Sequence, residues 1–162
     1  MKIRIKKKGD GSATSGRLGP GGFGAIHDLA HYVVESGLSL RHGFFGLLEQ
    51  GWAVSDFTAK GAAARLPDES IVTECVVGLL TNAVLAGSRP DPADFAAMVH
   101  AAVAGVRPGA PTPSLAPAMI AAWWRRLDGL VRQWRRLPSG GALELEFPAG
   151  VPAANHASCG TV

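Results

Sequence analysis

The sequence contains little cysteine, and this argues against two classes of protein. Its two cysteines, Cys75 and Cys159, lie far apart among 162 residues and form no Cys-x-x-Cys pair. We therefore expect neither the disulfide framework of a small secreted domain nor a cysteine-rich zinc site. A reducing compartment fits this composition.

Long apolar runs are also missing. The most apolar stretch, residues 71–86, is interrupted by Glu74 and Asn82 and is shorter than the roughly 20 residues of a membrane-spanning helix. The basic N-terminus leads into residues 9–12, which are glycine, aspartate and serine instead of the apolar stretch of a secretory signal. We therefore expect a cytoplasmic protein that does not associate with a membrane.

Charge of one sign is only slightly in excess. The chain has 16 Lys and Arg against 13 Asp and Glu, a net charge of +3, which does not by itself indicate an anionic partner. The basic residues concentrate in residues 1–17 and 125–136. With 47% hydrophobic residues, the chain is long enough for one domain, which we place at residues 1–148.

The patterning predicts a mostly α (α+β) fold. Apolar residues alternate with charged ones near both ends of the chain, as in strands with one buried face: Ile3, Ile5, Leu143, Leu145 and Phe147. We expect residues 1–8 and 143–147 to pair as a small two-stranded antiparallel sheet, because the basic face of one would lie opposite the glutamates of the other.

Between these strands the sequence predicts about five helices, with apolar residues three and four positions apart and Gly, Pro or Asp at the boundaries. The expected helices are residues 22–36, 42–57, 68–87, 91–105 and 118–137. The remaining segments are a flexible glycine-rich loop, a proline-rich connection and a disordered tail, at residues 9–22, 106–117 and 149–162.

The first of these helices gathers polar residues on one side. At about 100° per residue, His27, Asp28, His31 and Glu35 fall in one sector, separate from the apolar face. Two histidines at i and i+4 can direct their imidazoles at one point, which suits a divalent metal. Glu35, one turn further on, could be a third ligand or could hold a ligand imidazole by its distal N–H.

The motif His27-Asp28-x-x-His31 resembles the His-Glu-x-x-His helix of zinc metalloproteases, with Asp28 where those enzymes have the general-base glutamate. Aspartate is one methylene shorter, so peptidase activity does not transfer directly. The longer string over about residues 23–57 is similar to a group of small uncharacterised bacterial proteins, and this similarity carries no activity.

Glu74 is the preferred third ligand. It lies beside the apolar stripe of the helix expected at residues 68–87, where an unpaired carboxylate would be costly to bury. A glutamate from a later helix that completes a two-histidine site is similar to the arrangement in one branch of the zinc peptidases. Glu35, His42 and Glu49 compete with it. Zinc is the expected metal, with iron or manganese as alternatives.

Three functions remain open at this point. In the first, the protein is a metal-dependent hydrolase of a small molecule or a peptide, with Asp28 as the base and Tyr32, the only tyrosine, orienting substrate or donating a proton. In the second, the histidines and carboxylates are a structural polar cluster in a non-catalytic interaction protein. In the third, the same ligands hold a non-haem iron for redox chemistry.

The helix expected at residues 118–137 combines a tryptophan-containing apolar stripe with five arginines. Because the tryptophans fall within the stripe, we expect most of them in the core and do not expect nucleic-acid binding. Exposure of part of this stripe would make the helix a contact between subunits, so we expect a homo-oligomer formed through it.

Overall fold

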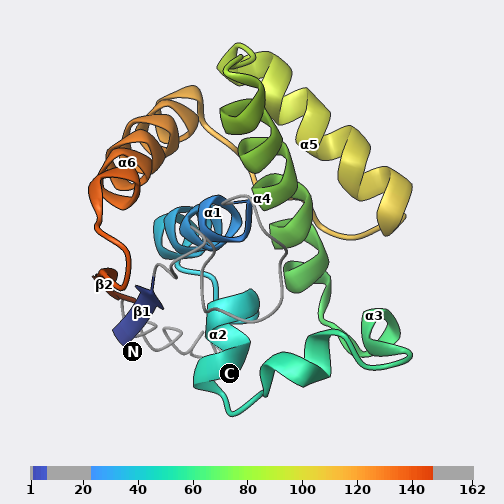
Figure 1. Ribbon diagram of the computed structural model, residues 1–162. Coiled ribbons are helices and arrows are strands. Elements are labelled where there is room, and N and C mark those ends of the chain that lie inside the picture. The colour runs from blue at the N-terminus through green and yellow to red at the C-terminus, as the bar shows by residue number, and fades with distance from the viewer. Residues whose placement is uncertain (1, 7–22, 148–162) are drawn as a thin grey trace, which may run out of the picture.

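The computed structural model describes residues 2–6 and 23–147, and most of these residues are helical (Figure 1). The helices are α1 (Phe23–Leu38), α2 (Phe44–Glu49), the 3₁₀ helix η1 (Val54–Phe57), α3 (Ala62–Arg65), α4 (Asp68–Ala86), α5 (Pro92–Val106) and α6 (Pro117–Arg136), and the strands are β1 (Lys2–Lys6) and β2 (Ala142–Glu146). This confirms the predicted fold class. The expected glycine-rich loop and C-terminal tail lie outside the described residues.

The two strands pair as predicted. β1 and β2 are antiparallel, with Ile3 opposite Leu145 and Ile5 opposite Leu143. Ile5 is fully buried, whereas Arg4 lies on the outer face with its Nε 3.6 Å from Oε1 of Glu144. The alternation of apolar and charged residues therefore sets both the pairing and the face that packs on the helices.

Helix α1 lies at the centre of the helical layer, with α4 and α5 on one side and α6 on the other (Figure 1). It is buried on most sides, as the zero exposure of Leu29 and Val33 shows. α4 is long and apolar enough to cross a membrane by length and composition alone, but here it packs between α1 and α5 as a core helix. The polar side chains of α1 and α4 therefore meet inside or at the edge of the core.

The tryptophans of α6 are core residues. Trp123, Trp124 and Trp134 are each no more than 6% exposed, and Trp124 packs edge to face on Phe95 of α5. The exposed side of α6 consists largely of its arginines. The apolar stripe that we expected to join two subunits is thus covered within the chain by α1 and α5.

One predicted helix is divided. The helix expected over residues 42–57 ends at Glu49, and a separate 3₁₀ helix follows at Val54–Phe57. Gly51, with φ of +97°, lies between them in a backbone region that non-glycine residues rarely adopt. The short helix α3 was not predicted, because its alanine-rich sequence lacks an apolar period.

Candidate metal centre

Helices α1 and α4 bring two histidines and one glutamate to a single point. His27 and His31 lie one turn apart on α1, and Glu74 faces them from α4. Nε2 of His31 is 3.2 Å from Nε2 of His27 and 3.3 Å from Oε1 of Glu74, and Nε2 of His27 is 3.6 Å from Oε2 of Glu74. Sequence reasoning predicted this set, and these residues form a group that could hold a metal ion.

These separations suit a small divalent ion. A zinc ion with bonds of about 2.0–2.1 Å in tetrahedral geometry holds its ligand atoms about 3.3 Å apart. The distances from Nε2 of His31 to Nε2 of His27 and to Oε1 of Glu74, 3.2 and 3.3 Å, lie close to that value. The 3.6 Å distance joins His27 to the other oxygen of Glu74, Oε2. With one ligand atom taken from each residue, the three atoms lie within 4.8 Å of one another, so side chains from two different helices come close enough to share one ion.

Glu35 supports His31 from the opposite side of its ring. Oε1 of Glu35 lies 2.9 Å from Nδ1 of His31, and Oε2 accepts hydrogen bonds from the backbone N–H groups of Phe45 and Gly46 at the start of α2. Because an ionised carboxylate only accepts hydrogen bonds, Nδ1 carries the proton and Nε2 faces His27 and Glu74. Of the two roles open to Glu35, the structure supports that of a positioning residue.

The approach of α2 to Glu35 depends on a glycine that the sequence pattern did not single out. A Cβ on Gly43 would lie 2.5 Å from both Cδ and Oε2 of Glu35. Only a residue without a side chain lets the chain before α2 pass this close to the carboxylate. The hydrophobic periodicity of residues 42–57 contains no signal for this contact, since it arises between α1 and α2.

Hydrogen bonding within the cluster shifts the pKa values of two members. Burial by itself would lower the pKa of His31, but hydrogen bonds with the carboxylates of Glu35 and Glu74 outweigh it and raise the pKa to about 9. Burial would raise the pKa of Glu74, but hydrogen bonds with His27 and His31 hold it well below its usual range. Without a metal, the cluster is thus an imidazolium between carboxylates.

Asp28 is buried next to this cluster. The residue is 6% exposed, and its Oδ2 has no hydrogen-bond partner within residues 2–6 and 23–147. Burial raises the pKa of Asp28 to about 7, while the charge of His31 lowers it and that of Glu74 raises it. A carboxyl group that titrates near neutral pH beside two metal-ligand candidates has the properties of an acid–base group.

Tyr32 faces away from the cluster. Its hydroxyl donates to the backbone oxygen of Glu146 in β2 at 3.2 Å and lies 2.9 Å from Nη2 of Arg126 in α6, whose guanidinium is stacked on the ring. The expectation that Tyr32 orients substrate or donates a proton is not supported by this position. Its contacts instead join α1 to α6 and to the sheet.

Two further candidate ligands also lie elsewhere. His42 is exposed, its backbone N–H donates to Oε1 of Glu69, and its Nδ1 is 3.6 Å from Oε2 of the same residue. Glu49 is exposed at the end of α2. Neither belongs to the group formed by His27, His31 and Glu74, so Glu74 is the third ligand that the geometry favours.

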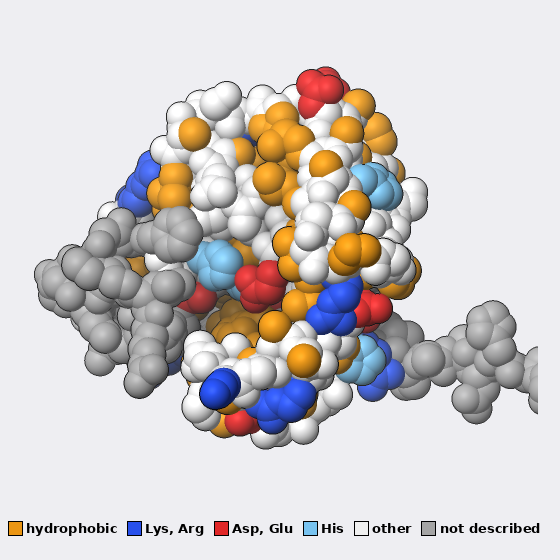
Figure 2. Space-filling model, turned by 90° about the vertical axis from the view of Figure 1, so that its right-hand side faces the viewer, with side chains coloured by type: hydrophobic (Ala, Val, Ile, Leu, Met, Phe, Trp, Pro, Cys, Tyr) orange, Lys and Arg blue, Asp and Glu red, His pale blue; other side chains and the backbone are white. Residues whose placement is uncertain are grey.

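One side of the cluster is accessible from solvent. The side chain of Glu74 is 47% exposed and that of His27 is 20% exposed, whereas His31 and Glu35 are almost fully buried. Figure 2 shows a histidine beside acidic side chains in a hollow of the surface, bordered by apolar side chains. On the buried side, Phe44 packs on His31 with 5.3 Å between ring centroids. A ligand can therefore reach the cluster past Glu74 and His27.

The arrangement has a buried anchor, an exposed ligand and an adjacent carboxyl group. Three protein ligands and one open position are typical of catalytic zinc sites, whereas structural zinc sites have four protein ligands. The functional assignment depends on this geometry, since comparisons of the chain with known protein families, with curated proteins and with solved structures found no match.

Proposed function

We propose that the protein is a metal-dependent hydrolase whose divalent ion is held by His27, His31 and Glu74. The observation that carries this proposal is that one ligand atom from each residue lies within 4.8 Å of the others, with Nε2 of His31 3.2 Å from His27 and 3.3 Å from Glu74. Zinc is the ion we propose first, because two imidazoles and one carboxylate are a common catalytic zinc set. Such an ion would supply a Lewis acid that activates water for attack on an ester, amide or similar bond.

Glu35 and α2 support a metal site more strongly than a simple ion-pair cluster. An imidazole that is held by a carboxylate, which is itself held by backbone N–H groups, is the arrangement that typically orients a metal-ligating histidine. In this role Glu35 fixes the ring of His31 and increases its basicity. The open side past Glu74 leaves room for substrate.

We assign the role of general base to Asp28. Asp28 follows His27 on α1 and is 6% exposed, and the charges of His31 and Glu74 shift its pKa in opposite directions. A bound cation would favour the ionised form of Asp28 and so prepare it to accept a proton from water. The substrate, a small molecule or a peptide, would enter over the exposed carboxylate of Glu74.

A structural polar cluster is the competing function. The hydrogen bonds among His31, Glu35 and α2 satisfy buried polar groups without any metal. In that case the protein would be a non-catalytic interaction protein. Iron in place of zinc, with redox chemistry on the same ligands, would be distinguished by the colour and iron content of the purified protein.

Metal content decides between these functions. The protein would be purified without a histidine tag, and its metals would be measured by mass spectrometry for the wild type and for the double variant His27→Ala, His31→Ala. We expect close to one metal per chain in the wild type and almost none in the double variant. His42→Ala removes an exposed histidine outside the cluster and should keep the metal. A folded wild type that binds no added zinc, iron or manganese would contradict the proposal.

Catalysis requires its own test. Asp28→Asn keeps the size of the side chain but removes the base, so we expect full metal content with hydrolysis lowered by a factor of about 10²–10⁴. The assay would use a panel of chromogenic esters, phosphoesters and peptides with zinc-loaded protein. Equal rates for wild type and Asp28→Asn would exclude Asp28 as the base while leaving the metal site intact.

A further inference from the structure

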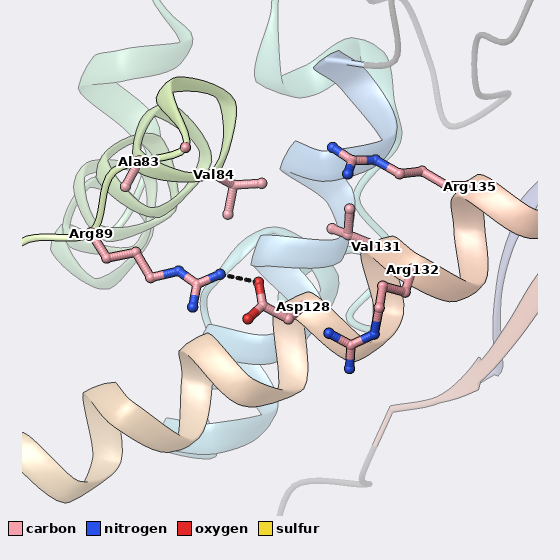
Figure 3. Close-up of a pocket in the computed structure, with 8 residues that line it drawn as sticks. Ala83, Val84, Arg89, Asp128, Val131, Arg132 and Arg135 are labelled. Carbon is pink, nitrogen blue, oxygen red and sulfur yellow. Dashed lines mark hydrogen bonds and ion pairs between the residues drawn. The ribbon is translucent and has the colours of Figure 1, made fainter.

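A second concave site lies at the other end of α4, away from the metal cluster. The groove lies between the end of α4 and the second half of α6 and has a volume of about 480 Å³. Its charged lining consists of Arg89, Asp128, Arg132 and Arg135, and Figure 3 shows their side chains around the groove. Glu74 and Gly87 are 13 residues apart, about 20 Å along the α4 axis. We call this site the arginine groove.

One arginine of the groove is held in a fixed position. The guanidinium of Arg89 forms an ion pair with Asp128 and lies over the ring of Trp124, 5.5 Å from its centroid. Two separate contacts from α6 thus orient a residue of the loop that follows α4. A guanidinium that is already ordered loses less conformational entropy on binding an anion than a free surface side chain would.

The charge of the groove is positive. Among the described residues that line the groove, Arg89, Arg132 and Arg135 are basic and Asp128 is acidic. The C-terminal end of α4 carries the negative end of the helix dipole. Two of its carbonyl oxygens, those of Ala83 and Val84, already accept hydrogen bonds from the backbone N–H groups of Ser88 and Gly87. Arginine forks bind phosphate oxygens in pairs, and several of them together favour a ligand that carries more than one negative charge.

We propose that the arginine groove binds a small solute that carries two or more phosphate groups. The volume of about 480 Å³ is in the range of small-molecule sites, about 300–1,000 Å³. The apolar side chains of Val84 and Val131, which also line the groove, would contact the organic part of such a solute. This proposal is independent of the metal cluster and of the hydrolase activity.

Isothermal titration calorimetry on full-length, metal-free protein would test the proposal, with tripolyphosphate and ATP as probes. Removal of metal prevents chelation at the His27 cluster from contributing heat. We expect saturable binding of one ligand per chain, weakened about tenfold or more by Arg132→Gln, which removes a charge-assisted contact.

Arg125→Gln is the matched control, because Arg125 is an exposed arginine of the same helix that does not line the groove. It should change the affinity less than twofold. An equal loss in Arg125→Gln and Arg132→Gln would overturn the proposal, since binding would then reflect the general charge of α6. Absence of saturable binding, or binding of a single-stranded oligonucleotide that depends equally on both arginines, would overturn it as well.

Discussion

Gly43 determines how closely the start of α2 can approach Glu35. A Cβ at this position would lie 2.5 Å from the Glu35 carboxylate, so Gly43→Ala must displace Glu35 and release the ring of His31. We predict that metal affinity falls about 10- to 100-fold, as is typical when the partner of a ligating histidine is lost. A competition titration with a zinc chromophore measures this.

Gly78→Ala is the control for that variant. Gly78 lies in α4, and a Cβ there would meet no atom within 4 Å, so the substitution should leave metal affinity unchanged. Circular dichroism shows whether both variants are folded. Equal zinc affinity for Gly43→Ala and wild type would mean that Glu35 does not orient His31.

Metal affinity should also depend on pH. The pKa of His31 is raised to about 9 by Glu35 and Glu74, so below pH 9 a metal must displace a proton from this ring. Glu74, with its lowered pKa, is already ionised. Because His31 must lose this proton, we expect metal affinity to increase about tenfold per pH unit between pH 7 and 8.5. The increase should level off above pH 9, where His31 is already neutral. Zinc titrations across this range, with proton release followed in weakly buffered solution, check the slope. A flat profile would contradict it.

At the level of single residues, the i, i+4 spacing of His27 and His31 and the position of Glu74 beside an apolar stripe were sufficient to predict the cluster. The choice between two roles for Glu35 required the structure, because it depends on where the backbone of α2 lies. The position of Tyr32 could not be derived either, since its hydroxyl contacts Arg126 and Glu146, which are more than 90 residues away.

At the level of elements, α4 and α6 were predicted close to their observed bounds. Pro67 and Gly87 mark the two ends of α4, and α6 has in addition a strong apolar period. The predicted second helix was wrong over residues 50–57, because Phe44, Phe57 and Trp52 form an aromatic cluster that requires the chain to turn at Gly51. In a cluster of this kind, apolar side chains pack against one another without lying on one face of a single helix. The spacing of apolar residues in the sequence therefore could not distinguish one long helix from two short ones.

The role of α6 can be tested with Trp123→Ala. Trp123 is 3% exposed in the core between α6 and α1, so truncation should lower the free energy of unfolding by about 3–5 kcal/mol. Because the ring is buried within the chain, we expect no change in the state of association. Urea unfolding and light scattering measure the two quantities, with Met98→Ala, at an exposed position of α5, as the control. Loss of a dimer without loss of stability would instead support the predicted contact between subunits.

At the level of the whole molecule, the cluster lies where α1 and α4 meet, and the two helices are among the most extensively packed pairs of the described chain. A metal bound by His27, His31 and Glu74 would join them. Because the three ligands are brought together only in the folded chain, binding should stabilise the native state by about 2.7 kcal/mol at a zinc concentration 100 times Kd.

This linkage predicts a change in thermal stability on removal of metal. For a chain of this size, about 2.7 kcal/mol corresponds to an increase in Tm of about 5–10 °C, and a chelator should reverse it. Calorimetry on wild type and on the double variant His27→Ala, His31→Ala, each with zinc and with chelator, measures the difference. The double variant should show no dependence on zinc. A wild-type Tm that is equally insensitive would mean that the cluster stabilises the junction of α1 and α4 through hydrogen bonds and ion pairs alone.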